Sequence, residues 1–320
     1  SDGPYNATGI SATPSRQRIF SCRPTSPANE LACAEEILSR LAHQAYRGKL
    51  DESTLEDLIS FYLQGAETGG FENGIRTALQ AILASPDFVF RLEVTPEDAR
   101  PGDTFGLADL DLASRLSFFM WGTPPDEELV QLAESEDLSK PAVWDRQVER
   151  MLADPRAESL GHRFAGQWLR LEDLEKVHPD RLLYPDFNQQ LADAMQTETE
   201  MFFNHLVKED RSVLELFTSN YTFANEALAK HYGIPDVAGD HFRRVQHADS
   251  NRKGILGHGS VLVLTSHASR TSPVLRGKWV MEVLLGTPPP PPPPGVPDLD
   301  ETEGVQEGRF LTTRERMEIH

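Results

Sequence analysis

The feature that most constrains this chain is a helical repeat of apolar residues that returns along most of its length. After residue 28 the segment NELACAEEILSRLAHQAY spaces its apolar side chains three or four positions apart, at Leu31, Ala34, Leu38, Leu41 and Ala45. That spacing lines one face of an α-helix, and Asn29 stands where an N-cap is expected. Residues 51–67 and 69–93 repeat the pattern. The first part of the chain is therefore predicted to be a small bundle of three helices.

A second helical region follows a stretch of turn-forming residues. Residues 94–107 carry Pro, Gly and Asp in quick succession, which is typical of a boundary. Helical patterns then recur from about 108 to 235, and the longest covers roughly 186–208. Residues 242–252 are expected to form either the one short strand of the chain or an irregular loop. The predicted fold class is all-α, built from multi-helix bundle modules.

Seven consecutive prolines, Pro288 to Pro294, interrupt this pattern near the end of the sequence. In the polyproline II conformation they would span roughly 20 Å, at about 3.1 Å per residue. We expect a stiff C-terminal strap that packs on aromatic side chains such as Trp279 and positions the segment that follows. The alternative is a simple spacer.

Charge and composition exclude several classes of function. The net charge is −19 and the isoelectric point is near 4.9, whereas binding to nucleic acid or anionic lipid requires a basic face. No apolar run approaches the roughly 18 residues that a membrane span needs. The sequence begins without Met and without a signal peptide, so we expect it to be a piece of a longer or processed protein.

Cys22 and Cys33 are the only cysteines, and they allow two interpretations. A disulfide would close a short loop onto the start of the first helix and would indicate an oxidising compartment. Two buried free thiols in a reducing compartment are the alternative. We favour the disulfide, because no other ligands cluster near these cysteines to complete a zinc site.

Most familiar catalytic motifs are missing from the sequence. It has no P-loop, no dinucleotide-binding glycine pattern, no His-Glu-x-x-His and no nucleophile elbow. It also has no C-x-x-C redox pair and no C-x-x-C-H haem motif. Polar side chains instead gather in residues 254–282, around an apolar run, at His258, Ser260, Ser266, His267, Ser269, Arg270, Thr271, Ser272, Arg276 and Lys278.

A helix is predicted to begin inside this segment, because Ser272 is a capping residue and Pro273 suits the first helical position. The loop SHASRTS would precede that helix, where backbone N–H groups favour an anion. Arg270 and Arg276 could add a guanidinium fork for a carboxylate, a phosphate or a haem propionate. The alternative is a tight loop in which histidine and hydroxyl groups only satisfy buried backbone groups.

We therefore name His267 and Arg270 as candidate catalytic residues. The candidate ligand-binding residues are His258, Ser266, Thr271, Arg276 and Trp279. No metal site is predicted.

Other polar and aromatic positions are interpreted as structural. His162 and His231 lie on amphipathic helical patterns and are expected at the edge of a core. The run from Phe118 to Trp121 is expected to provide packing. Glu198 and Glu200 lie seven and five positions before His205. We reject a carboxylate metal site there, because helical di-metal sites use a Glu-x-x-His spacing.

Several phrases together resemble one family across nearly the whole chain. They are IFSCRP, CAEEILSRLAHQAYRG, ALQAILASPDFVFRLE, LASRLSFFMWGTPPDEELVQLA, RFAGQWLRL, YTFANEALAKHYGI and HGSVLVLTSHASRTSPVLRGKWVMEVLLGTPPPPPPPGVP. The sequence resembles planctomycete-type multidomain secreted proteins of unknown function that are associated with c-type cytochrome segments. The resemblance implies the tail of a preceding domain over 1–20 and a small helical module over 21–93. It further implies a central helical module over 108–240 and the start of a C-terminal polyproline module over 250–320.

The resemblance also sets the functional expectation. It implies a periplasmic or secreted protein, the helical core of a cytochrome c-linked oxidoreductase that acts on carbohydrates or alcohols. Haem c is expected in the full-length protein but not attached within this chain, and cytochrome c-type domains are the expected partners. A non-catalytic scaffold that positions electron-transfer domains is the main alternative. A hydrolase using His267 with Ser266 or Ser269 is disfavoured, because neighbouring residues rarely orient as nucleophile and base.

Overall fold

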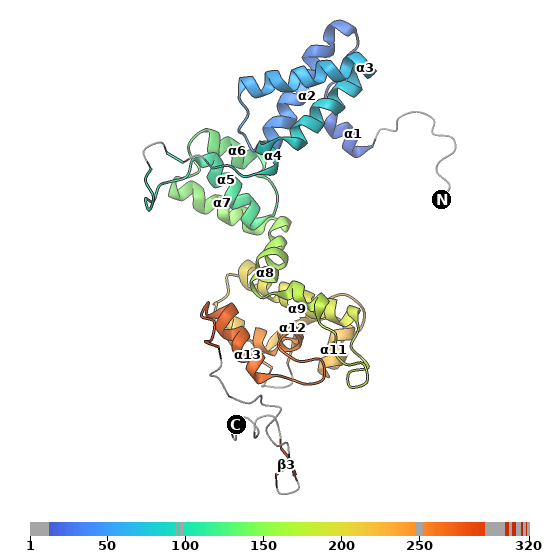
Figure 1. Cartoon of the computed structure of the whole chain (residues 1–320), viewed down its shortest axis with the longest axis vertical. Helices are drawn as coiled ribbons and strands as arrows, with labels where there is room; N and C mark the ends of the chain where they lie inside the picture. Colours follow the sequence, from blue (N-terminus) through green and yellow to red (C-terminus); the bar gives the residue numbers. More distant parts are fainter. Residues whose placement is uncertain are drawn as a thin grey trace, which may run out of the picture. The chain divides into compact units, whose positions relative to one another are not determined.

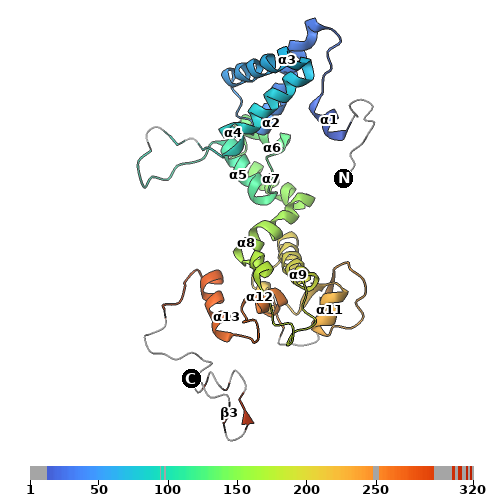
Figure 2. The ribbon, with the colours of Figure 1, turned by 45° about the vertical axis from the view of Figure 1, so that its right-hand side comes forward.

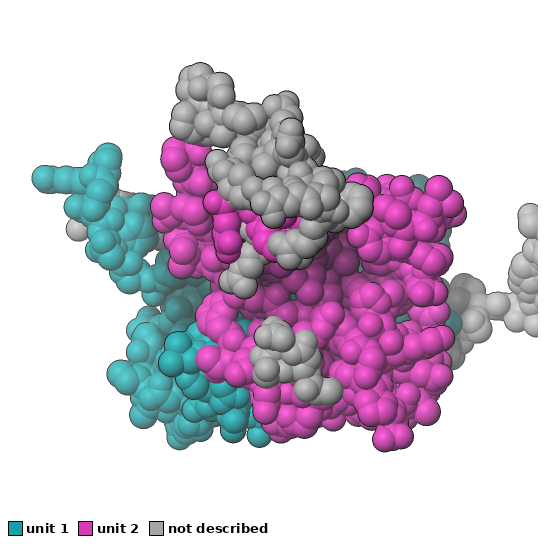
Figure 3. Space-filling view, turned by 90° about the horizontal axis from the view of Figure 1, so that it is seen from below, with its two compact units in different colours: residues 1–167, 199–216 teal, residues 168–198, 217–320 magenta. Residues whose placement is uncertain are grey.

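The computed structural model describes residues 13–93, 95–96, 99–247 and 252–291, together with 305–306, 309–311, 315 and 318. It divides the chain into two compact units, coloured separately in Figure 3: residues 1–167 with 199–216, and residues 168–198 with 217–320. Helices dominate the described part of both units, so the predicted all-α class is confirmed.

The first unit opens with two short helical segments and a helical hairpin, seen in Figures 1 and 2. The elements are α1 (Pro14–Ile19), η1 (Pro27–Asn29), α2 (Glu30–Ala45), α3 (Glu52–Ala84) and α4 (Pro86–Val89). Within α3 the backbone leaves helical geometry at Gly69 and Gly70, and Gly70 has φ of +73°. The two predicted helices are therefore present and are joined across a kink. Gly74 lies against the Tyr62 ring with no room for a Cβ, which lets the two halves pack closely.

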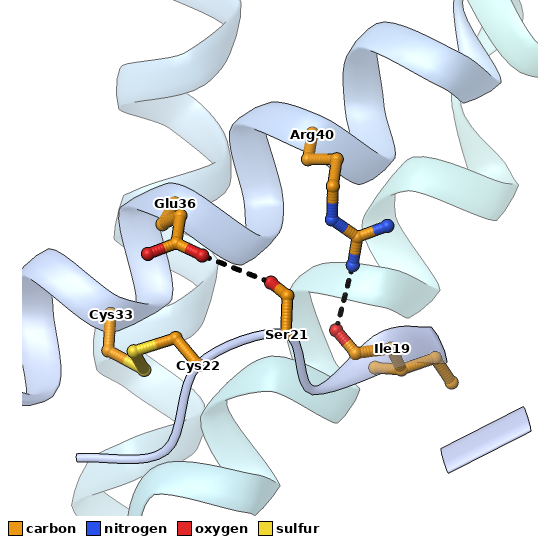
Figure 4. Close-up of a disulfide and its surroundings, with 6 residues drawn as sticks. All are labelled: Ile19, Ser21, Cys22, Cys33, Glu36 and Arg40. Atoms are coloured by element: carbon orange, nitrogen blue, oxygen red, sulfur yellow. Dashed lines mark hydrogen bonds between the residues drawn. A yellow bond between two sulfur atoms is a disulfide. The ribbon is translucent and has the colours of Figure 1, made fainter. Parts of the chain in front are cut away.

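The disulfide predicted between Cys22 and Cys33 is present, with the two Cα atoms 5.6 Å apart. Figure 4 shows it at the start of α2, beside two further links between the same segments. Ser21 donates a hydrogen bond to Glu36 at 3.2 Å, and Arg40 donates one to the Ile19 carbonyl at 3.0 Å. These contacts attach the segment after α1 to α2, over a core that includes Ile37, Leu38, Tyr62, Ile75 and Ile82.

The rest of the first unit surrounds a second core. Its elements are α5 (Asp109–Met120), α6 (Glu127–Glu134), α7 (Pro141–Ala153), η2 (Pro155–Glu158), η3 (Leu160–Ala165) and the C-terminal part of α9 (Gln189–Lys208). Trp121 is buried in this core and donates its indole N–H to the Met151 carbonyl at 3.0 Å. The acidic first turn of α6 is capped by Asp126, whose side chain accepts from the Leu129 N–H, an arrangement that suits the positive end of a helix.

The second unit combines short helices with a small antiparallel sheet. Its elements include η4 (Leu171–Lys176), the first half of α9, β1 (Tyr221–Ala224), α11 (Glu226–Tyr232), β2 (Arg243–Gln246), η5 (Ile255–Gly257), α12 (Gly259–Leu264), α13 (Pro273–Trp279) and η6 (Val280–Leu284). The short elements α8 (Gly166–Trp168) and α10 (Glu215–Thr218) lie where the chain passes between units. The structure also has β3 (Val305–Gln306) paired with β4 (Arg309–Phe310).

The expectation of one short strand, within residues 242–252, is wrong, because the structure also has β1, β3 and β4. We expected residues from 222 onward to lead directly into a helix, but Tyr221–Ala224 forms β1, which pairs antiparallel with β2. The helix begins only at Glu226, because the Asn225 side chain caps it by accepting from the Leu228 N–H at 3.0 Å. The segment 242–252 does contain a strand, β2, and part of that segment lies outside the described residues.

Two further expectations fall partly on residues that the structure does not describe. Of the proline run, Pro288 to Pro291 are described, whereas 292–294 are not, so the packing of the strap stays a prediction. Most of the expected tail of a preceding domain, 1–20, also lies outside the described residues. Within the described part of the chain, no helix has the length and apolar character of a membrane span.

The disulfide provides a stability prediction. Replacing both cysteines (C22S/C33S) should destabilise the first unit by about 3 kcal/mol, because the bond no longer restricts the unfolded chain over a separation of 11 residues. Urea unfolding followed by far-UV circular dichroism measures this loss. Treating the wild-type protein with dithiothreitol should reproduce it, and the variant should not respond to the reductant. Equal urea midpoints of unfolding for the oxidised and the reduced wild-type protein would contradict the prediction.

Candidate ligand-binding site

The second unit contains a pocket of about 550 Å³ at the segment that the sequence singled out. Its walls come from the loop after η4, from α9, from α11, from α12 and from the turn that leads into α13. The lining is mostly apolar, and several of its polar residues come from one segment, 266–276. The lining residues are Val177, Pro179, Leu183, Tyr184, Pro185, Asp186, Phe187, Met195, His231, Leu262, Val263, Ser266, His267, Arg270, Thr271 and Arg276.

The polar side of the pocket is a tight hairpin turn. Ser266 and Thr271 form an antiparallel bridge, and within it the His267 N–H donates to the Arg270 carbonyl at 2.9 Å. The loop after η4 holds the turn from outside, because the Asp180 N–H donates to the Ala268 carbonyl at 2.8 Å. The turn is therefore fixed by backbone hydrogen bonds.

Helix α13 begins where the sequence predicts, and it places Arg276 beside the turn. Ser272 is buried and caps the helix by accepting from the Leu275 N–H at 3.3 Å. The Arg276 guanidinium donates to the Thr271 hydroxyl at 3.1 Å and reaches the Thr265 hydroxyl at 3.4 Å. Both threonine hydroxyls are neutral, so these contacts orient the guanidinium without neutralising it.

Arg276 is a partly buried cation that contacts no carboxylate among the described residues. Loss of solvent lowers the pKa of its guanidinium, which marks an environment that disfavours the positive charge. Since arginine keeps its proton in proteins, the missing counter-charge is the strongest chemical feature of the pocket. A ligand with an anionic or strongly polar end would supply it.

Two histidines and one carboxylate complete the polar lining. His231 comes from α11 and His267 from the turn, and both are exposed at the pocket surface. Desolvation and then the charge of Arg252 lower the pKa of His231, while Asp186 acts in the opposite direction. His231 is therefore neutral at pH 7 and able to accept a proton.

The structure brings five of the seven predicted site residues to one pocket, namely Ser266, His267, Arg270, Thr271 and Arg276. His258 and Trp279 are not among the residues that line it. His258 has no exposed surface, and burial lowers its pKa to about 3, so its imidazole stays neutral. Trp279 is buried at the end of α13 with 6% of its surface exposed.

A buried carboxyl group lies behind the pocket wall. Glu198 on α9 has no exposed surface. It accepts hydrogen bonds from the Thr222 hydroxyl on β1 and from the Tyr232 hydroxyl on α11, both at 2.6 Å. The Tyr232 oxygen in turn accepts from the Gly259 N–H at the start of α12, also at 2.6 Å. This chain of bonds connects three elements that contribute pocket residues.

Burial gives Glu198 an unusual protonation behaviour. Loss of solvent raises the pKa of its carboxyl from 4.5 to about 7, and the hydrogen bonds from Thr222 and Tyr232 and the charge of Arg252 oppose the shift. Arg252 also stacks on the Tyr232 ring, with its guanidinium carbon 4.5 Å from the ring centroid. The pKa of Tyr232 is raised as well, first by its own burial. Desolvation therefore outweighs these interactions, and the folded state favours the protonated Glu198 carboxyl up to about pH 7.

Sequence reasoning missed Glu198 and undervalued His231. Glu198 was considered only as a metal ligand, and among the described residues no cluster of metal-ligating side chains occurs. A signal was available, because Leu191, Met195, Glu198 and Phe202 follow helical spacing on the buried face of α9. A glutamate within an apolar stripe indicates a buried carboxyl with dedicated partners. No comparable sequence signal indicates that His231 lines the pocket.

Three family models match consecutive stretches of the chain, and each is described as a protein of unknown function. PSD5 (DUF1595) matches residues 33–93, PSD4 (DUF1592) matches residues 107–234 and PSCyt3 (DUF1588) matches residues 252–320. These are domains of planctomycete proteins associated with cytochrome c. The chain carries one stretch matching each of these three family models, in consecutive order. The predicted resemblance is thereby confirmed. No curated protein and no solved structure matches the chain.

The family association raises the question of haem, so we tested the residues of this chain against its requirements. Covalent attachment of haem c needs a pair of cysteines followed by histidine. Both cysteines of the sequence are joined in the disulfide, and neither stands in such a motif. The residues of this chain therefore do not fit haem c attachment.

The buried carboxyl predicts a pH dependence of stability. The folded state binds the Glu198 proton more tightly than the unfolded state, so protonation of this carboxyl stabilises the folded state. Its full contribution to the free energy of unfolding is present below about pH 4.5. The contribution is lost as the pH rises through about 7. Replacing the carboxyl with a neutral amide (E198Q) should remove this loss, which we expect to be on the order of 1–3 kcal/mol between pH 5 and pH 8.

The measurement is urea unfolding of the wild type and the variant at a series of pH values. Glu175→Gln is the matched control, because Glu175 is an exposed glutamate of the same unit. The control should keep the wild-type pH profile. If E198Q also keeps that profile, the carboxyl is not the titrating group.

Proposed function

We propose that this chain is the helical ligand-binding core of an extracytoplasmic oxidoreductase that works with cytochrome c domains. The matches to three cytochrome c-associated family models support the redox setting. The Cys22–Cys33 disulfide is compatible with an oxidising, extracytoplasmic compartment. The pocket of the second unit is the place where this chain would hold a substrate.

The observation that carries the proposal is the combination of an apolar wall with the uncompensated cation of Arg276. Met195, Phe187 and Leu262 offer an apolar surface, which favours a ligand with an apolar body. Arg276 favours an anionic or strongly polar group at one end of that ligand. Of carbohydrates and alcohols, the pocket therefore favours an alcohol with an apolar body, or the organic acid derived from it.

The polar residues of the pocket have distinct proposed roles. Arg276 and Arg270 bind and orient the oxygen of the ligand. Oxidation of an alcohol to a carbonyl compound releases two electrons and two protons, so the site needs a proton acceptor. His267 and His231 are the candidates. The lowered pKa of His231 favours the neutral imidazole, the form that can accept a proton, and also makes it a weaker base.

A scaffold function is the second candidate, and it too has a supporting observation. The turn uses several polar groups to hold neighbouring backbone: Ser266 donates to the Leu262 carbonyl at 2.7 Å and Tyr184 reaches the Ser269 carbonyl at 3.4 Å. Under this alternative the turn would only position electron-transfer domains, and the pocket side chains would have no ligand.

Ligand binding at Arg276 can be tested with 8-anilinonaphthalene-1-sulfonate, a fluorescent probe that combines aromatic rings with one negative charge. Arg276→Gln should weaken its binding by about tenfold or more, because a charge-assisted hydrogen bond is lost. Lys278→Gln is the matched control: it makes the same change of charge on the same helix, at an exposed residue outside the pocket lining. Equal affinities for the two variants would contradict the binding role.

Catalysis is tested separately, on the full-length gene product exported to the periplasm. Benzyl alcohol serves as substrate and ferricyanide as electron acceptor. We expect turnover that falls at least tenfold in Arg276→Gln, with an unchanged visible spectrum. Probe binding without any turnover would favour the scaffold or a different substrate class.

A further inference from the structure

The first unit contains a second pocket, of about 380 Å³, whose lining is unusually cationic for this protein. It lies among the loop after α2, the residues that follow α4 and the first half of α5. The lining residues are Arg47, Lys49, Arg91, Leu92, Glu93, Leu110, Asp111, Ser114 and Arg115. Four basic residues therefore face two acidic ones, in a chain whose net charge is −19.

Two of the four cations already have carboxylate partners. Lys49 forms an ion pair with the buried carboxylate of Asp111. Arg115 binds Glu93 through two parallel hydrogen bonds, of 2.5 and 2.7 Å. These pairs neutralise both acidic residues of the lining, so neither carboxylate is left to balance the remaining arginines.

The other two cations contact no carboxylate within the described part of the chain. Arg47 is buried, with 7% of its surface exposed. Its guanidinium donates only to backbone carbonyls, including Phe88 at 3.4 Å and Phe90 at 2.8 Å. Burial, and then the neighbouring charge of Arg91, lower the pKa of Arg47, while the charges of Asp87 and Asp111 act in the opposite direction. Arg91 stacks on the Phe118 ring, with its guanidinium carbon 4.8 Å from the centroid. Counted over its lining, the pocket has two more basic than acidic side chains.

The floor of the pocket has polar oxygens without partners. Ser114 is 7% exposed and Asp111 is 4% exposed. The Ser114 hydroxyl and the second carboxylate oxygen of Asp111, Oδ2, have no hydrogen-bond partner among the described residues. Buried polar atoms in folded proteins are nearly always satisfied. These two atoms can be satisfied by a ligand that brings hydroxyl groups along with its negative charge.

The wall of the pocket is held in place by close backbone packing. Arg47 and Gly48 both have left-handed backbone geometry, with φ of 59° and 87°. A Cβ on Gly48 would lie 2.8 Å from the Leu110 side chain and 3.0 Å from that of Val130. The loop that carries Arg47 and Lys49 therefore packs tightly on α5, which carries Asp111 and Ser114.

We propose that this pocket binds a hydroxylated organic anion of the size of a sugar acid. The excess of two cations selects for negative charge, and Asp111 Oδ2 with the Ser114 hydroxyl selects for hydroxyl groups. The site lies in a different unit from the pocket that contains Arg276, so it does not depend on the proposed oxidoreductase function.

The test is isothermal titration calorimetry of the whole chain with three probes. D-Glucuronate carries both the charge and the hydroxyl groups, inorganic sulfate carries only charge, and D-glucose carries only hydroxyl groups. Glucuronate should bind at least tenfold more tightly than either of the others. If sulfate binds equally well, the hydroxyl part of the proposal is wrong. If glucose binds equally well, or if glucuronate does not bind, the anion site is wrong.

Variants then connect binding to this pocket. Arg91→Gln should weaken glucuronate binding by about tenfold, because it removes one of the two excess charges. Arg76→Gln is the matched control, since Arg76 is exposed in the same unit and does not line the pocket. Ser114→Ala should weaken glucuronate binding by about fivefold and leave sulfate binding unchanged. Equal effects of R91Q and R76Q would place the binding elsewhere and overturn the assignment.

Discussion

The hydrogen bonds of one buried carboxyl group, that of Glu198, hold the second unit together. They connect α9 to β1 through Thr222 and to α11 through Tyr232, and the Tyr232 oxygen binds the first N–H of α12 at Gly259. Separating any of these elements would leave a buried polar atom without its partner, at a cost of about 1–3 kcal/mol each. The polar network therefore adds directional contacts to the apolar core that the same elements share through Met195, Ala224 and Leu228.

The pocket with Arg276 is a consequence of that network. Met195 lies one helical turn before Glu198, His231 precedes Tyr232, and the apolar pocket residues of α12 follow Gly259. The walls on α9, α11 and α12 are thus attached to members of the hydrogen-bonded chain. Burial raises the pKa of the Glu198 carboxyl to about 7, so its protonation changes near neutral pH.

Much of the fold could be predicted from the sequence, because its information is local. Apolar spacing indicated α2, both halves of α3 and α9, and the Ser272–Pro273 pair marked the start of α13. Five pocket residues were found because they adjoin in sequence. Strand β1 was missed, since its pairing with β2 is a contact between distant segments. Glu198 and His231 were missed for the same reason, because their roles come from partners on other elements. The basic pocket of the first unit likewise joins residues more than forty positions apart, at Arg47 and Arg91.

The central claim is that Glu198 keeps its proton at a pH where ordinary glutamates have lost theirs. Infrared difference spectroscopy during a pH titration, comparing the wild type with E198Q, observes that proton directly through the carbonyl stretch of the protonated carboxyl. The account predicts a band that is absent from E198Q and that disappears in the wild type near pH 7. Loss of the band near pH 4.5, the ordinary value for glutamate, would contradict the account.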